Sequence, residues 1–285
     1  ILENVSRRKA QFHTSSKGGF KSKSLIKLNG YKSFFAFTFC LTIFLISFLF
    51  PVSQMLYWTI IFPQHLANLN VGKLFFNTIL LVSLSSCLLI ALAFISNYGN
   101  RVSKSKFLKI LNIFSISGYA IPGIILAVAF ITFISWFDNQ IINHFEIKSI
   151  KPFFIGSILG LVLVYFIRFY SLANNGIKSG YEKINYSIDE SAYLLGYSKF
   201  KTFKNVHIPY LKNSILLISI LLTIEIIKEL PITLILRPFN FETFATKAYL
   251  FASQDLLEAA AAPSLLLIVI ASFFILITSR HTLKE

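Results

Sequence analysis

Long apolar runs alternate with short basic clusters along the whole 285-residue chain. Hydrophobic residues make up 55% of the sequence and charged residues only 14%. Soluble domains carry about 25% charged residues, whereas a run of about 20 apolar residues can cross a bilayer as a helix. The sequence therefore predicts an all-α integral membrane protein.

Six apolar runs are long enough to be transmembrane helices. They cover residues 34–61, 75–95, 118–136, 153–169, 214–236 and 263–278. Gly118, Pro122 and Gly123 interrupt the start of the third run, so we expect a broken first turn there. Residues 34–280 should form one six-span domain, and the polar, basic segment 1–33 a cytoplasmic tail or a linker.

Most of the 27 Lys and Arg residues lie on one side of this topology. They precede the first span, separate the second from the third and the fourth from the fifth, and follow the last. Because cytoplasmic loops retain positive charge, we expect both termini in the cytoplasm of a multi-pass protein in a bacterial inner membrane. The net charge of +15 is then a topology signal that also attracts anionic lipid, and no nucleic-acid partner is expected.

Motifs for metal binding or ATP hydrolysis are missing from the sequence. Cys40, Cys87 and the five scattered His residues show no metal-ligand spacing. No G-x-x-x-x-G-K-[ST] loop occurs, and the nearest segment, residues 18–22, lacks the Gly that must directly precede Lys. We therefore expect no catalytic residue, metal site or cofactor in this chain.

The connection between the fourth and fifth spans has signals for two short helices. Ser187 can cap the first helix, with Glu190 completing a capping box, and Gly196 can end it in a left-handed conformation. Ser198 can cap the second helix, and Pro209 marks the turn toward the membrane. We call residues 186–212 the elbow and expect it to be rigid and partly apolar.

The order of residues in the elbow resembles the EAA loop, E-A-A-x3-G-x9-I-x-L-P, of binding-protein-dependent ABC-importer permeases. The matching positions are Glu190-Ser191-Ala192, Gly196, Val206 and Ile208-Pro209, with Ser191 in place of an alanine. In that family the loop is a coupling helix that inserts into a cleft on the ATPase subunit. The resemblance implies a six-span type I importer fold, a cytoplasmic ABC ATPase dimer that holds ATP and Mg²⁺, and docking through these residues and Asp189. A helix pair that merely lies on the membrane surface is the alternative.

Two further segments, residues 118–123 and 228–241, look like ferric-iron permeases. In that family one polypeptide commonly holds two six-span halves, and this chain resembles the C-terminal half. The resemblance implies a second permease half, fused or separate, a periplasmic substrate-binding protein, and Fe³⁺ as the cargo. Permeases for thiamine, polyamine, phosphonate, molybdate or sulfate share the loop and the six-span pattern, so they remain alternatives.

Glu225, Lys228 and Glu229 are ionisable residues placed deep within the fifth predicted span. Charges inside a bilayer are costly and are functional candidates by default. Their spacing of three and four residues places them on one helix face, which makes them candidates for lining a translocation path. An ion-paired cluster that holds the span to its neighbours near a kink at Pro231 is the interpretation that we favour. A secondary transporter, with this cluster as its ion-coupling site, is the rival function.

Overall fold

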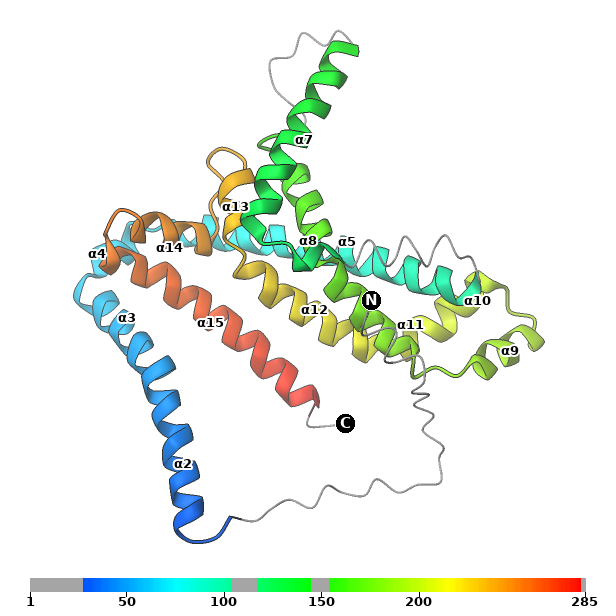
Figure 1. The fold of residues 1–285 in the computed structure, drawn as a ribbon, viewed down its shortest axis with the longest axis horizontal. Coiled ribbons are helices and arrows are strands. Elements are labelled where there is room, and N and C mark those ends of the chain that lie inside the picture. Colours follow the sequence, from blue (N-terminus) through cyan, green and yellow to red (C-terminus); the bar gives the residue numbers. More distant parts are fainter. Residues whose placement is uncertain (1–27, 104–116, 145–153, 283–285) are drawn as a thin grey trace. The chain divides into compact units, whose positions relative to one another are not determined.

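The computed structural model describes residues 28–103, 117–144 and 154–282 (Figure 1). All regular structure in these ranges is helical, which confirms the all-α prediction. The chain divides into two compact units, residues 1–51 and 52–285. The predicted basic segment 1–33 is described only from Leu28, so most of it lies outside the described residues.

The first predicted span is one apolar helical run, Tyr31–Ile61, of 31 residues. It consists of α2 (Tyr31–Phe44), a π-helical turn η1 (Leu45–Leu49) and α3 (Phe50–Ile61). No side chain of these three elements is buried. A helix that is apolar on all sides needs an apolar surrounding, which fits a membrane span.

Three helices form the core of the second unit (Figure 1). α5 (Val71–Val102), α8 (Ile158–Tyr181) and α12 (Lys212–Ile227) pack against one another. Each contributes a fully buried apolar side chain, among them Leu89, Tyr165 and Leu222. Gly176 allows α8 to approach α12 closely, because a Cβ atom there would lie 2.5 Å from the Ile218 side chain.

Four shorter or peripheral elements complete the second unit. They are α4 (Pro63–Ala67), α13 (Pro231–Leu236), α14 (Phe244–Ala252) and α15 (Leu257–Thr282). α14 and α4 pack on α15, whereas α13 packs on α7 (Gly123–His144) and on α8. Leu74 of α5, Phe244 of α14 and Ala262 of α15 share a small buried cluster. This cluster fixes α14 and α15 to the beginning of α5.

Among the described residues, five helices are long and apolar enough to cross a membrane. They are Tyr31–Ile61, α5, α7, α8 and Leu257–Thr278. The fifth predicted span contains α12, which has only 16 residues. It reaches the required length only as a bent pair with Lys199–Tyr210, at an angle of 69°, and that segment belongs to the elbow. α5 extends beyond its predicted bounds at both ends, and α8 begins later than predicted but continues to Tyr181, because polar residues there remain helical where the hydropathy signal stops.

Two spans are broken close to a proline. In the third, a 3₁₀ turn η2 (Ser117–Ala120) precedes α7, which begins at Gly123; the predicted broken first turn is confirmed. Gly118 cannot carry a side chain, since a Cβ atom would lie 2.1 Å from the carbonyl oxygen of Ile167. The fifth span, predicted over 214–236 with a kink at Pro231, is also interrupted there. α12 ends at Ile227 and α13 begins at Pro231, where proline suits a first helical turn but not a helix interior.

Candidate coupling site

The elbow contains the two predicted helical arms. The first is α9 (Tyr186–Leu194), and the second comprises α10 (Lys199–Thr202), η3 (Phe203–His207) and α11 (Ile208–Tyr210). The side chain of Asn185 accepts a hydrogen bond of 3.3 Å from the Ser187 amide, so Asn185 is the cap of α9. The predicted capping box of Ser187 with Glu190 is therefore wrong. Asn and Ser are equally good caps, and they stand two residues apart here.

The turn between the arms has the predicted geometry. Gly196 has a φ of +78°. The amide of Tyr197 donates to the Ala192 carbonyl at 3.0 Å and the amide of Gly196 donates to the Tyr193 carbonyl at 2.9 Å, which is the Schellman pattern of a helix end. Ser198 accepts a hydrogen bond from the Lys201 amide at 3.3 Å and caps the second arm. The left-handed stop and the second cap are confirmed.

Replacing Gly196 with alanine should destabilise the protein by about 1–2 kcal/mol, because a Cβ atom is disfavoured in the left-handed region. Gly99 is a matched control, since it lies within α5 and a Cβ atom added there would have no neighbour within 4 Å. Alanine at Gly99 should stabilise by about 0.5–1 kcal/mol. Chemical unfolding of both purified variants measures the two changes in the free energy of unfolding. Changes of the same sign in both variants would contradict the left-handed turn at Gly196.

Arg101 fastens the first arm to the end of α5. Its Nε lies 2.6 Å from Oδ2 of Asp189, and its Nη2 donates to the carbonyls of Ile184 at 3.0 Å and Asn185 at 3.1 Å. The guanidinium also lies 4.3 Å from the ring centre of Tyr186. The side chains of the pair are only 7% and 11% exposed, and such charge-assisted contacts are strong. Sequence reasoning counted Arg101 only as a topology charge.

His207, in the second arm, lies beside the same carboxylate. Its side chain is fully buried, and Nε2 lies 3.0 Å from Oδ1 of Asp189. Its ring packs between those of Tyr98 and Tyr181, with centroids 5.3 and 5.4 Å away. Burial lowers the pKa of His207 from its ordinary value, although the negative charge of Asp189 opposes this. The imidazole is therefore neutral at neutral pH, and Arg101 balances the charge of Asp189.

The predicted docking residues divide into an inner and an outer set. Asp189 and Ala192 are buried and Val206 is partly buried, whereas Glu190, Ser191, Gly196, Ile208 and Pro209 are exposed. Sequence reasoning missed three exposed apolar side chains beside them, which we call the elbow surface: Leu194 at 89%, Leu195 at 78% and Phe200 at 73% exposure. Clustered apolar side chains on a surface mark interaction sites.

The charges of the fifth span do not share one face. Nζ of Lys228 lies 2.7 Å from Oε1 of Glu225, and the Lys228 side chain is 56% exposed. Glu229 is instead 7% exposed and lies 3.1 Å from Nε of Arg168 on α8. The predicted common face is confirmed for Glu225 and Lys228 but is wrong for Glu229, because α12 ends at Ile227 and helical spacing does not extend to Glu229.

The pair of Arg168 and Glu229 joins the breaks of both interrupted spans. Nη1 of Arg168 donates to the Ile121 carbonyl, ahead of α7, at 2.9 Å. Oε1 of Glu229 accepts from the amide of Ile232, in α13, at 3.4 Å. Gly123 leaves room for the pair, since a Cβ atom there would lie 2.9 Å from that oxygen. In the described part of the chain no group of three potential metal ligands is present.

No protein-family model matches the chain. In sequence it is 21% identical over 260 residues to the Fe(3+)-transport system permease protein FbpB 2 of Haemophilus influenzae. The alignment covers 90% of this chain and 49% of that protein. The chain therefore spans about half the length of this curated relative.

Two solved structures have a similar fold. One is a bacterial ABC transporter involved in the import of the acidic polysaccharide alginate, with a TM-score of 0.65, 17% identity, and 88% of this chain and 95% of that chain covered. The other is a bacterial alginate ABC transporter in complex with an alginate pentasaccharide-bound periplasmic protein, with a TM-score of 0.62, 17% identity, and 86% and 92% covered. The chain thus has the multi-pass fold of ABC-importer permeases and resembles a ferric-iron permease in sequence.

Proposed function

We propose that the chain is the permease subunit of an ATP-driven importer and that its elbow docks a cytoplasmic ABC ATPase. The observation that carries this proposal is the exposed elbow surface, held rigidly at the end of α5 by Arg101 and Asp189. A short, rigid element can transmit a rigid-body displacement between two discrete states. ATP and Mg²⁺ belong to the partner ATPase, and this chain binds no cofactor of its own.

The elbow residues have two kinds of role in this proposal. Glu190, Ser191, Ile208 and Pro209 contact the ATPase together with the elbow surface, because these side chains are exposed. Asp189, Ala192 and Gly196 instead maintain the shape of the elbow. The two buried residues face the permease, and Gly196 provides the left-handed turn. Val206 is partly buried.

Fe³⁺ is the proposed cargo, delivered by a periplasmic binding protein and moved across a bacterial inner membrane. The similarity to a ferric-iron permease over 260 residues supports this choice. A second permease half, fused or separate, completes the pathway, and both termini face the cytoplasm. The same machine for another solute is the second candidate, favoured by the likeness in fold to alginate transporters.

Glu225 and Lys228 are the remaining path candidates. They pair at 2.7 Å on a surface of α12 where Lys228 is exposed. Charged side chains within a bilayer face water or protein rather than lipid, so this pair would face the path or the second half. Glu229 is buried against Arg168 and has a structural role here.

Reconstitution into liposomes with the ATPase, the second half and the binding protein tests the proposal. Uptake of labelled Fe³⁺ should require ATP and both partner proteins. Leu194→Asp should abolish it, because a charge in an apolar docking surface cannot be desolvated. Leu256→Asp is the matched control, since Leu256 is 44% exposed after α14, away from the elbow, and should retain uptake.

Three outcomes would overturn parts of the proposal. Uptake without the ATPase that follows a proton or sodium gradient would indicate a secondary transporter. Uptake of another solute without iron flux would reject Fe³⁺ as the cargo. Full uptake by Leu194→Asp would reject the elbow surface as the docking site.

A further inference from the structure

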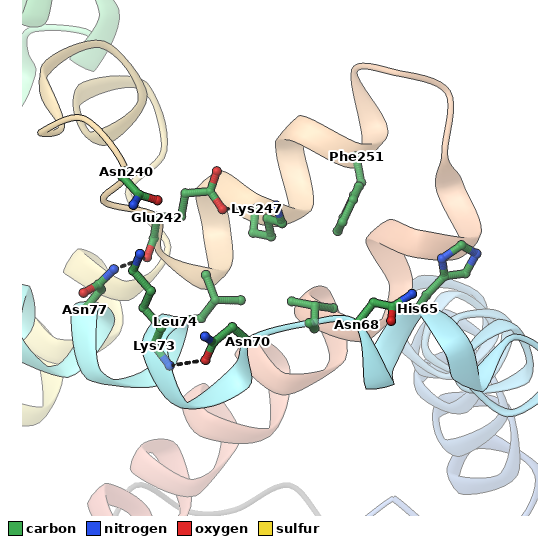
Figure 2. A pocket seen from close by; sticks show the side chains of 11 residues that line it. His65, Asn68, Asn70, Lys73, Leu74, Asn77, Asn240, Glu242, Lys247 and Phe251 are labelled. Atoms are coloured by element: carbon green, nitrogen blue, oxygen red, sulfur yellow. Dashed lines mark hydrogen bonds and ion pairs between the residues drawn. The ribbon is translucent and has the colours of Figure 1, made fainter.

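A cavity of about 420 Å³ lies at the beginning of α5, at the opposite end of this helix from the elbow (Figures 1 and 2). Its walls come from the end of α4, the first turns of α5, the connection between α13 and α14, and α14 itself. The lining side chains with polar groups are His65, Asn68, Asn70, Lys73, Asn77, Asn240, Glu242 and Lys247.

The cavity is held in shape by contacts between segments far apart in the sequence. Nδ2 of Asn77 donates to the Glu242 carbonyl at 2.9 Å, across 165 residues (Figure 2). The amide of Phe244 donates to Oγ1 of Thr78 at 3.4 Å, and the Phe244 side chain is only 1% exposed. Binding pockets are usually pre-formed in this way.

The charges around the cavity are mostly positive. Glu242 is the one carboxylate in its lining. It lies 3.1 Å from Nζ of Lys247 and 3.6 Å from Nη1 of Arg237. Lys73 also lines the cavity, and its ammonium group has no acceptor among the described residues. A carboxylate that entered the cavity would give Lys73 a charge-assisted partner.

An exposed aromatic residue directly precedes one of the lining residues in the sequence. Phe239 is 100% exposed and directly precedes Asn240, which lines the cavity. Aromatic residues are enriched in the cores of protein interfaces and often anchor them. A free anion would not use such a side chain, so the combination of Lys73 and Phe239 favours a protein surface as the occupant.

The position of the cavity on α5 identifies the side of the membrane. Lys73 and Arg101 are 28 residues apart on one helix, which corresponds to about 42 Å along its axis. A bilayer with its headgroups is about 40–45 Å thick. With the elbow in the cytoplasm, as the proposed function requires, the cavity opens at the outer face.

We infer that this cavity and Phe239 form the docking site for an acidic side chain on the surface of the soluble substrate-binding protein. Lys73 pairs with the incoming carboxylate, Glu242 keeps Lys247 and Arg237 in place, and Phe239 packs against the adjoining surface. The inference rests on the proposed function, because it requires a binding protein on the outer side.

The test is a titration of Fe³⁺-loaded binding protein onto the complete transporter, with both halves and the ATPase, in lipid nanodiscs. Lys73→Glu should weaken binding at least about tenfold, since like charges would then oppose each other. Because salt screens this repulsion, the fall in affinity with rising salt should be lost or reversed. Phe239→Ser should weaken binding at unchanged salt dependence. Lys183→Glu, an exposed lysine just before the elbow, is the matched control and should bind normally.

The outcomes separate this inference from the proposed function. Thermal unfolding of each variant establishes that it is folded, and Lys73→Met should give an intermediate affinity. Normal binding by folded Lys73→Glu would overturn the inference while leaving the importer intact. Absence of binding to the wild-type transporter would instead reject the proposed function. Calorimetric binding of free citrate that Lys73→Glu abolishes, with normal binding of the protein partner, would assign the cavity to a small anion.

Discussion

Replacing Arg101 with alanine is expected to lower the free energy of unfolding by about 3–5 kcal/mol and to abolish the proposed ATP-driven transport. The change leaves the carboxylate of Asp189 buried without its cation and removes the donors to the Ile184 and Asn185 carbonyls. The elbow would then lose its attachment to α5. Chemical unfolding and ATP-driven uptake by the reconstituted transporter measure the two losses.

Two further variants distinguish the effect of the elbow's attachment to α5 on transport from its effect on the stability of the protein. Arg101→Lys keeps the charge but lacks the planar fork that reaches several acceptors, so an intermediate loss is expected. Arg101→Met combined with Asp189→Leu should recover much of the stability, whereas transport should remain lost because the elbow is no longer tied to α5. Recovery of transport together with stability would mean that the pair matters only for folding.

Replacing Arg168 with methionine is expected to have an effect of similar size, about 3–5 kcal/mol. It leaves Glu229, which is 7% exposed, without its cation, and it removes the hydrogen bond that holds Ile121 ahead of α7. Both broken spans should therefore become mobile at their breaks. Thermal unfolding in detergent measures the loss, and hydrogen exchange at Ile232, whose amide donates to Glu229, reports on the break itself.

The control for this site is the double variant Arg168→Met with Glu229→Met. Two apolar side chains of similar volume in place of a buried ion pair are often neutral or stabilising, so most of the loss should be reversed. Lys228→Met tests the neighbouring pair with Glu225, whose lysine is exposed. It should reduce stability less than Arg168→Met, and an equal loss would contradict the distinction between the two pairs.

The spans and the elbow turn were predictable because their signals are local in the sequence. Runs of apolar residues identified the five long apolar helices and the segment that contains α12, and the need for a left-handed residue at Gly196 is a property of one position. The prediction was poorest where two local signals compete. Asn185 and Ser187 are both good caps, and only the folded chain shows that Asn185 is used.

The ion pairs were not predictable from one sequence, since each joins residues that are far apart along the chain. Arg101 and Asp189 are separated by 88 residues, and Arg168 meets Glu229 only because α8 lies beside the break after α12. The helical spacing of Glu225, Lys228 and Glu229 was misleading for a related reason. It assumed that the helix continues, whereas Pro231 starts a new one.

The 32 residues of α5 form one helix without proline, about 48 Å long. Lys73, which lines the cavity, and Arg101, which holds the elbow, thus lie on one continuous helix. Tilting a helix of this length by about 5° moves one end by about 4 Å relative to the other. A displacement of α5 at one membrane surface can therefore be transmitted to the other surface by tilting of this helix alone, without movement of the connecting loops.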